Sequence, residues 1–99
     1  MVRVAWTELS VEDLKEIYDY ISQDSVRYAE ITVNKIYNRV QILRNYPRSG
    51  KIVLEFNDQY IREIISGNYR IVYKIVTESQ VDIIRIYHSA RLLDKDSLK

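Results

Sequence analysis

The stretch Asn68-Tyr69-Arg70-Ile71-Val72-Tyr73-Lys74 decides how this chain folds, because its pattern is that of a strand apolar on both faces. β-branched and aromatic residues crowd this stretch and the Ile75-Val76 pair that follows it. Side chains of these types fit a pleated surface that is covered on both sides. We therefore expect a strand over residues 69–77 in the centre of a sheet.

The segment that follows completes a β-hairpin. Thr77-Glu78-Ser79-Gln80 is a turn-type connection, and residues 80–88 again carry strand-forming side chains. This segment leads into Ile86-Tyr87-His88-Ser89-Ala90-Arg91, which holds the only histidine of the chain. The hairpin thus places cationic side chains and the histidine on elements that otherwise resemble buried core.

Three further strands are expected outside this hairpin. After Gly50 the period of the pattern changes to two, which predicts strands over residues 52–55 and 60–65. Ser66-Gly67-Asn68 would connect the second of these to the central strand. At the N-terminus, residues 2–6 alternate apolar and other side chains, so they predict a strand at the edge of the sheet.

The first helix is expected to begin near Ser10. Ser10 fits an N-cap, Asp13 fits a weak capping box, and Leu9 with Leu14 fit a hydrophobic staple. A buried stripe with helical spacing follows, made of Leu14, Ile17, Tyr18 and Ile21.

A second, longer helix should start after a tight turn over residues 22–25, capped by Asp24 or Ser25. One apolar seam runs along it, made of Ala29, Val33, Ile36, Val40 and Leu43. The helix should end near Tyr46, because Pro47 disfavours the α conformation in the residue before it. Two amphipathic helices joined so closely predict an antiparallel helical hairpin.

Together these elements predict an α+β domain in which the helical hairpin packs on one face of an antiparallel meander. Alternation places Arg70 on one face with Val72 and Lys74. On the last strand it places Asp82, Ile84, Ile86 and His88 on one face, opposite Val81, Ile83, Arg85 and Tyr87. The second face of the sheet is expected to be wet or to carry a partner, and strand register decides which cations share it.

Composition excludes several other classes of protein. A chain of 99 residues makes one domain, residues 1–99. It has no cysteine and one histidine, so neither a disulfide framework nor a zinc site built from cysteine and histidine is expected, and we expect no cofactor. Residues 1–6 lack the apolar core of a signal peptide and no run reaches the ~20 residues of a membrane span, which predicts a cytoplasmic protein.

The formal net charge of +1 is unevenly distributed along the chain. Residues 1–31 carry three basic and seven acidic side chains, whereas residues 32–99 carry twelve basic and seven acidic ones. Between Glu30 and Glu55 no acid occurs, and the five basic residues there are Lys35, Arg39, Arg44, Arg48 and Lys51. Such a stretch binds phosphate backbones or an acidic peptide, or it is simply a solvated helix face.

The polar residues could support cleavage of RNA without a metal. Such a reaction needs a base for the 2′-hydroxyl proton, an acid for the leaving oxygen, and cations beside the phosphorane. Glu55 would be the base and His88 the acid, and the clamp would be formed by Arg62, Arg70 and Arg91. Tyrosines, nine of the eleven aromatic residues, would stack on bases.

Each of these residues also has a structural explanation. A histidine at a strand end is commonly a hydrogen-bonding residue of the fold. Glu55 would then be part of a surface ion pair, and Arg62 and Arg70 would pair across strands with Glu63 or Glu55 and stabilise the sheet. From the residues alone, both explanations stay open.

The order of the motifs resembles the toxins of bacterial type II toxin–antitoxin systems, the RelE/ParE superfamily. The resemblance runs over nearly the whole chain and rests on Pro47-Arg48-Ser49-Gly50, on Glu55 and Arg62, on "NYRIVY" at residues 68–73, and on "IYHSAR" at residues 86–91. It implies a β-α-α-β-β-β(-β) domain, with an antiparallel sheet packed against a helical hairpin.

Two activities occur within that superfamily. RelE-like and YoeB-like toxins cleave mRNA on the ribosome with a Glu, an Arg and a His or Tyr, whereas ParE-like toxins poison DNA gyrase and have no nuclease centre. Matched by motif, the catalytic residues of a nuclease would be Glu55, Arg62, Arg70 and His88. The "HSARLLD" ending at residues 88–94 looks more like the ParE branch.

The leading expectation is therefore a growth-inhibiting, ParE-like inhibitor of DNA gyrase of the kind that stabilises plasmids. A metal-independent, ribosome-dependent mRNA endonuclease is the alternative, and a binding module without toxicity is a second one. The resemblance also implies a cognate antitoxin, acidic and partly disordered, that forms a hetero-oligomer with the toxin. The residues expected to bind partners are Lys35, Arg39, Lys51, Tyr73, Tyr87 and Arg91.

Overall fold

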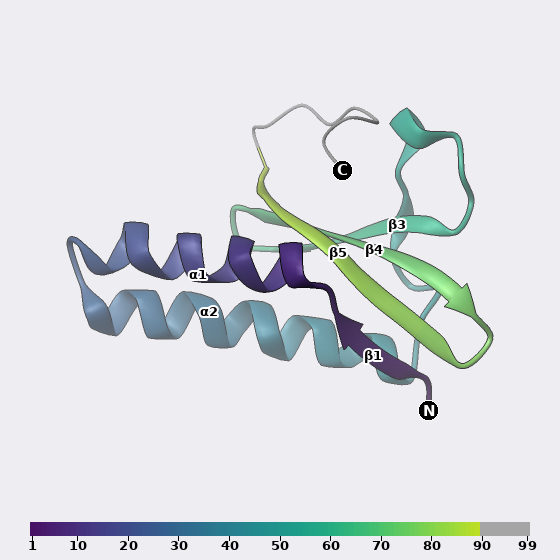
Figure 1. Ribbon diagram of the computed structural model, residues 1–99, viewed down its shortest axis with the longest axis horizontal. Coiled ribbons are helices and arrows are strands. Elements are labelled where there is room, and N and C mark those ends of the chain that lie inside the picture. The colour runs from purple at the N-terminus through teal and green to yellow at the C-terminus, as the bar shows by residue number, and fades with distance from the viewer. Residues whose placement is uncertain (90–99) are drawn as a thin grey trace.

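Five strands form one mixed sheet with the order β1-β5-β4-β3-β2 (Figure 1). Their bounds are β1 Arg3–Trp6, β2 Lys51–Ile52, β3 Ile61–Ser66, β4 Tyr69–Thr77 and β5 Gln80–His88. This computed structural model describes residues 1–89 of the chain. Strands β2 to β5 pair antiparallel and β4 lies in the centre, as predicted, but β1 pairs parallel with β5, which the sequence did not indicate.

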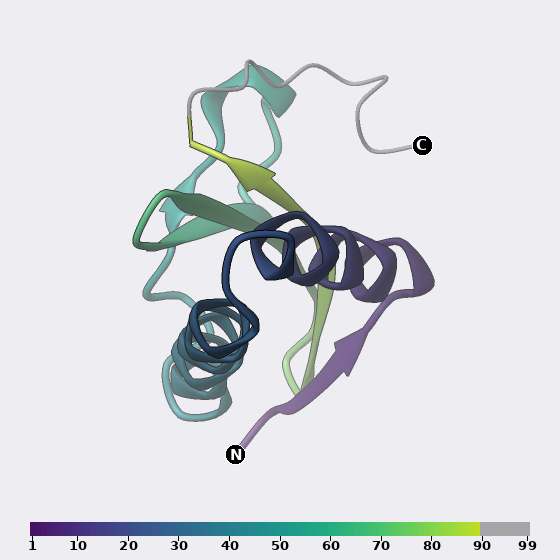
Figure 2. The same cartoon turned by 90° about the vertical axis from the view of Figure 1, so that its left-hand side faces the viewer.

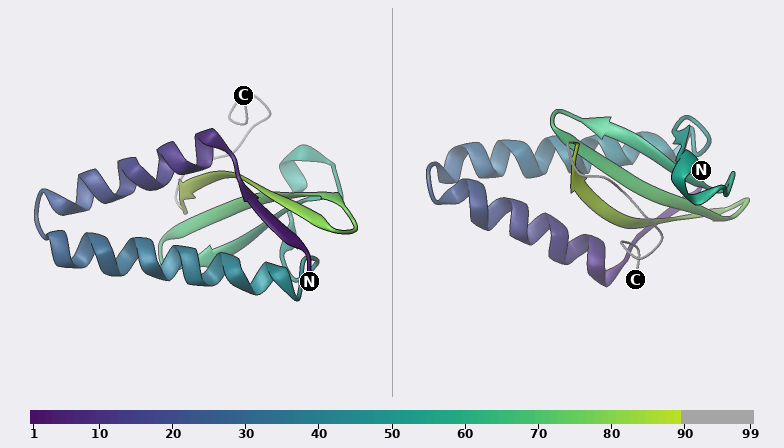
Figure 3. Two further views of the ribbon diagram at one scale, coloured as in Figure 1. Left: turned by 60° about the horizontal axis from the view of Figure 1, so that its bottom comes forward. Right: turned by 90° about the horizontal axis from the view of Figure 1, so that it is seen from above.

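Two helices, α1 (Glu8–Ser22) and α2 (Val26–Gln41), form the predicted antiparallel hairpin and cover one face of the sheet (Figures 2 and 3). The oxygen of the Ser25 side chain accepts a hydrogen bond from the Tyr28 N–H, so Ser25 is the N-cap of α2. A 3₁₀ turn, η1 (Ile42–Arg44), extends α2. The expected seam is confirmed: Ala29, Ile36, Val40 and Leu43 are completely buried, and Val33 is partly buried.

The N-cap of α1 differs from the prediction. Thr7, not Ser10, caps this helix, because its Oγ1 accepts the hydrogen bond from the Ser10 N–H. The Ser10 hydroxyl donates back to the Thr7 carbonyl oxygen at 2.7 Å, which buries Ser10 inside the first turn. Thr7 Oγ1 also donates to the Ile83 carbonyl oxygen at 2.7 Å, so the cap is fixed by a strand that is distant in the sequence.

Asp13 joins α1 to the edge of β5 instead of completing a capping box. Its carboxylate accepts hydrogen bonds from Arg85 Nε at 2.8 Å and from the Ile86 N–H at 2.9 Å. The guanidinium–carboxylate hydrogen bond raises the pKa of Arg85 further above its usual value. Strand β1 pairs with β5 only as far as Ile83. Beyond that point Asp13 accepts the hydrogen bond of the Ile86 N–H, which has no partner on β1.

A β-bulge in β5 changes the predicted faces of this strand. Val72 pairs with Arg85 while Tyr73 pairs with Ile83, which leaves Ile84 as the extra residue. The helix-facing core consequently includes both Ile86 and Ile83, which simple alternation placed on opposite faces. One inserted residue is enough to reverse the side-chain pattern beyond it.

The expected strand over residues 52–55 is much shorter in the structure. After β2 the chain forms the 3₁₀ turn η2 (Leu54–Phe56), so Glu55 lies on this turn. Val53 and Phe56, three residues apart, are both buried against Val72 and Tyr87. A 3₁₀ turn brings such residues to the same side, and the loop thereby covers part of the sheet face opposite the helices (Figure 2).

None of the helices within residues 1–89 has both the length and the apolar character that crossing a bilayer requires.

Candidate functional site

Arg70 lies between two carboxylates on the sheet face that the helices leave uncovered. Its Nε donates to Glu63 Oε2 at 2.8 Å, and its Nη2 bonds the same oxygen. Glu55 Oε2 lies 3.5 Å from Arg70 Nη2. The Arg70 and Glu63 side chains are 15% and 10% exposed, whereas Glu55 is 42% exposed, so Glu63 is the shielded partner and Glu55 the solvated one.

Strand register and a buried anchor bring this cluster together. Glu63 pairs with Val72 and Ile65 pairs with Arg70, so Glu63 and Arg70 are diagonal neighbours on one face. Glu55 arrives from η2, which the buried side chains of Val53 and Phe56 hold in place. The cross-strand pairing that the sequence allowed for Arg70 is therefore confirmed.

The charges around Arg70 balance one another. Arg70, Glu55 and Glu63 line an open hollow together with Lys51. The other lining residues include Ile52, Leu54, Ile65 and Ser89. Two cations, Lys51 and Arg70, thus face two carboxylates, Glu55 and Glu63. Among residues 1–89, the hollow therefore has no excess of the positive charge that stabilises a phosphorane.

Arg62 holds two loops together. Its Nη1 donates to the carbonyl oxygens of Arg48 at 3.0 Å and Gly50 at 3.1 Å, and its Nε donates to that of Gln59 at 3.1 Å. Arg62 pairs with Tyr73, whose side chain belongs to the helix-facing core. Arg62 therefore lies on the opposite face of the sheet from Arg70.

His88 also lies on the helix side of the sheet. It pairs with Tyr69 across β4 and β5, and the two rings meet edge to face with centroids 5.8 Å apart. Burial, followed by the proximity of Tyr28 and Tyr20, raises the pKa of Tyr69. The structure thus brings Glu55 and Arg70 together and places Arg62 and His88 across the sheet from them.

Tyr73 and Tyr87 are buried side chains, although the sequence suggested them as partner-binding residues. Tyr73 has no exposed surface, and its hydroxyl accepts from the Gly50 N–H at 2.9 Å and donates to the Pro47 carbonyl oxygen at 2.7 Å. Burial raises the pKa of Tyr73, more than the Gly50 hydrogen bond lowers it. Tyr87 is 2% exposed, and the Arg85 guanidinium lies 5.0 Å from its ring centroid. Neither ring is open to a partner in this conformation.

Three of the other binding candidates lie near β3, on α2 or on β2. Arg39 Nε donates to the Ile65 carbonyl oxygen at 3.0 Å, which joins α2 to β3. Lys51 on β2 pairs with Glu63 on β3, and Lys35 on α2 lines a hollow with the β3–β4 turn. Arg91 lies outside the described residues.

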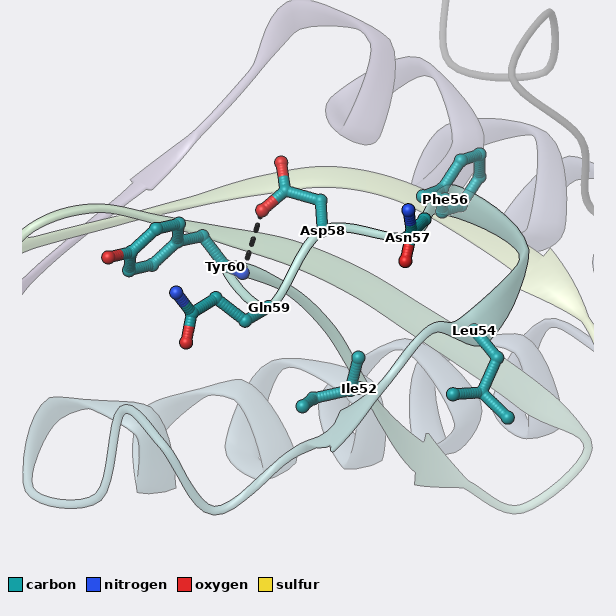
Figure 4. A pocket seen from close by; sticks show the side chains of 7 residues that line it. All are labelled: Ile52, Leu54, Phe56, Asn57, Asp58, Gln59 and Tyr60. Atoms are coloured by element: carbon teal, nitrogen blue, oxygen red, sulfur yellow. Dashed lines mark hydrogen bonds between the residues drawn. The ribbon is translucent and has the colours of Figure 1, made fainter.

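The loop between β2 and β3 presents apolar side chains that the sequence did not single out (Figure 4). Leu54 is 78% exposed although its neighbours Val53 and Phe56 are buried. Ile52 and Tyr60 line the same hollow as Leu54, and the Asp58 carboxylate fixes the loop by accepting from the Tyr60 N–H at 2.9 Å. The sequence contained one indication of this arrangement, the apolar residues Val53 and Phe56 at i, i+3 spacing. When both are buried in a 3₁₀ turn, Leu54 between them points to solvent.

Within residues 1–89, the side chains of His, Asp and Glu form no cluster of three or more that could hold a metal ion. The arrangement described above offers ion pairs, open sheet edges and exposed apolar side chains, which are features of a surface that binds macromolecules.

A family model for the ParE toxin of the type II toxin–antitoxin system, parDE, matches residues 4–93. The chain belongs to this toxin family. Toxin RelE2 of Caulobacter vibrioides (strain ATCC 19089 / CIP 103742 / CB 15) is 30% identical over 92 residues, covering 93% of this chain and all of that protein. The similarity to Toxin RelE2 therefore extends over nearly the full length of the present chain.

The fold of the toxin is also found in a solved structure of the chromosomal ParDE TA system from P. aeruginosa. The TM-score is 0.73 with 21% sequence identity, and the match covers 89% of this toxin and 96% of that chain. The agreement supports the arrangement of a helical hairpin on a five-stranded sheet.

Proposed function

We propose that this type II toxin inhibits DNA gyrase and does not act as a ribosome-dependent nuclease. The observation that carries the proposal is the separation of the four candidate catalytic residues. Glu55 and Arg70 lie on one face of the sheet, whereas Arg62 and His88 lie on the other. An acid and a base that act on one phosphodiester must both reach it.

Two further features support the proposal. Arg70 is already neutralised by Glu63 and Glu55, so little of its charge is left for a transition state. Arg62 is bound to three carbonyl oxygens, which gives it a role in the fold. The match to the ParE family model over residues 4–93 agrees with both features.

The alternative is a metal-independent mRNA endonuclease, and two observations favour it. Glu55 and Arg70 lie 3.5 Å apart beside an open hollow, which is an arrangement that a base and a charge-stabilising group need. The related protein from Caulobacter vibrioides also bears the name Toxin RelE2. On this alternative Glu55 would be the base.

As the toxin of a type II system, the protein has an antitoxin as its partner. We propose that the antitoxin is the acidic, partly disordered protein that the sequence led us to expect. It would neutralise the toxin by binding the surface near Lys35, Arg39 and Lys51.

Growth of bacteria that express toxin variants tests the proposal. The wild-type chain is expected to arrest growth, and co-expression of the antitoxin encoded beside it should restore growth. Glu55→Gln and His88→Ala should arrest growth as the wild type does. Loss of a general base or acid typically costs about 10²–10⁴-fold in rate, so a nuclease would lose its toxicity with either change. Thermal unfolding of each variant shows whether a loss of toxicity comes from a loss of folding.

A further inference from the structure

An open hollow lies between α1 and the last residues of β5. Strand β1 pairs with β5 only as far as Ile83, and α1 packs beside the rest of β5. Side chains of α1, β4 and β5 line the hollow, which has a volume of about 480 Å³. Sites for small ligands are typically ~300–1,000 Å³, so this α1–β5 hollow is large enough for one.

One face of α1 forms an acidic and aromatic wall of the hollow. The lining residues of this helix are Asp13, Glu16, Ile17 and Tyr20, and this i, i+3, i+4, i+7 spacing places them on the same side. The helix carries five acidic side chains and one basic one. The potential at this wall is therefore negative, which favours a cation and disfavours a phosphate or a nucleic acid.

One part of the hollow is already occupied by a guanidinium of the chain itself. Arg85 donates two hydrogen bonds to the Asp13 carboxylate, from Nε to Oδ2 at 2.8 Å and from Nη2 to Oδ1 at 3.0 Å. The same guanidinium lies 5.0 Å from the centroid of the Tyr87 ring. A carboxylate and a tyrosine ring thus hold a planar cation here, through paired hydrogen bonds and a cation–π contact.

The neighbouring part of the hollow offers the same two kinds of group. Glu16 takes part in none of the ion pairs among residues 1–89, and Tyr20, one turn further along α1, is 75% exposed. Tyr69 lines the opposite side, with the His88 ring against it edge to face. Arg85 is the one permanent cation among the described lining residues, so it leaves one of the two carboxylates, Asp13 and Glu16, unbalanced.

We propose that the α1–β5 hollow binds a guanidinium group from another molecule. The group would pair with the Glu16 carboxylate and lie against the Tyr20 ring, repeating the arrangement of Arg85 between Asp13 and Tyr87. A guanidinium suits these groups better than an ammonium, because it binds a carboxylate through two hydrogen bonds and stacks on aromatic rings. A free guanidino compound and an arginine side chain of another protein both supply this group.

NMR shifts of the isotopically labelled, full-length protein test the proposal. Ethylguanidinium is the probe and ethylammonium is the comparison, both at low salt. Ethylguanidinium should shift the Ile17 amide and the Tyr20 ring signals in a saturable way, with a Kd of roughly 1–10 mM, as one exposed ion pair and one cation–π contact would give. Ethylammonium should bind about threefold more weakly or less tightly still.

Variants at exposed positions separate the carboxylate from the ring. Glu16→Gln should weaken binding of ethylguanidinium about two- to fivefold, because it removes the charge and keeps the shape. The matched control is Glu8→Gln, about 12 Å away on the same helix, which should leave binding unchanged. Tyr20→Leu should weaken binding about two- to fivefold, whereas Tyr20→Phe keeps a ring and should change it less than twofold.

A capped Gly-Arg-Gly peptide distinguishes the two sources of the group. Tighter binding of this peptide than of ethylguanidinium would assign the site to an arginine side chain, and weaker binding would assign it to a free compound.

Three outcomes would overturn the proposal: no saturable shift at Ile17 and Tyr20, binding of ethylammonium as tight as that of ethylguanidinium, or unchanged affinity in both Glu16→Gln and Tyr20→Leu. The assay contains neither gyrase nor ribosomes, so its result does not depend on the proposed target.

Discussion

The Tyr73 hydroxyl accepts a hydrogen bond from the Gly50 N–H at 2.9 Å, which ties the central strand to the loop that precedes β2. A Cβ on residue 50 would lie 2.4 Å from the Tyr73 hydroxyl oxygen, so only glycine fits there. The same hydroxyl donates to the Pro47 carbonyl oxygen. The proline–glycine turn and the "YRIVY" strand, far apart in the sequence, are thus parts of one structural unit.

Tyr73→Phe is expected to destabilise the protein by about 1–3 kcal/mol, because it leaves the buried Gly50 N–H without its acceptor. The free energy of unfolding in urea measures this. Tyr20→Phe is the matched control, since Tyr20 is 75% exposed, and it should change stability by less than about 0.5 kcal/mol. Equal losses for the two variants would show that the hydrogen bond contributes nothing.

Stability should also fall at alkaline pH through Tyr73. Burial raises the pKa of Tyr73 above its usual value of 10.0, so the folded protein holds this proton more tightly than the unfolded chain does. The resulting stabilisation is complete below pH 10.0 and is lost as the pH rises through the raised pKa. The free energy of unfolding of the wild type should therefore fall more steeply above that pH than that of Tyr73→Phe. Parallel curves would contradict this assignment.

The two glutamates beside Arg70 should differ in their effect on stability. Glu63→Gln removes the shielded partner and should cost about 1–3 kcal/mol, since hydrogen bonds to charged groups are the stronger ones. Glu55→Gln removes the exposed partner and should cost about 0–1 kcal/mol. Unfolding in urea at low and high salt compares them. If Glu55→Gln were the more damaging change, Glu55 would be the main partner of Arg70.

Asp13→Asn tests the link between α1 and β5. It weakens the bonds to Arg85 and to the Ile86 N–H, and we expect a loss of about 1.5–3 kcal/mol in the free energy of unfolding. Glu12→Gln, at the exposed neighbouring position, is the control and should have little effect. A loss no larger than that of the control would mean that Asp13 is not needed to hold the edge of β5.

The sequence correctly predicted the elements in which apolar side chains recur at a regular spacing. β4 is apolar on both faces and lies in the centre of the sheet, and the α2 seam repeats at helical spacing, so both were correctly located. The cap at Thr7 was missed because it also depends on the carbonyl groups of Ile83 and Ile84, which no local motif reveals.

The site depended on contacts that a linear pattern does not contain. One extra residue at Ile84 sets which face of β5 carries each side chain, so the separation of His88 from Arg70 was not visible in the sequence. Glu55 left the expected strand because Val53 and Phe56 are both buried by a 3₁₀ turn. The ion pair of Arg70 with Glu63 was predictable, since cross-strand pairing of opposite charges is a common feature of sheets.

Gyrase inhibition tests the central claim most directly. Purified full-length protein is added in parallel to gyrase with relaxed plasmid DNA and to translating ribosomes with a defined mRNA, and supercoiling and mRNA cleavage are both measured. The separation of Glu55 and Arg70 from Arg62 and His88 predicts that the mRNA stays intact, and the proposed function predicts that supercoiling is inhibited. Cleavage of the mRNA with full gyrase activity retained would contradict the account and assign the toxin to the ribosome-dependent nucleases.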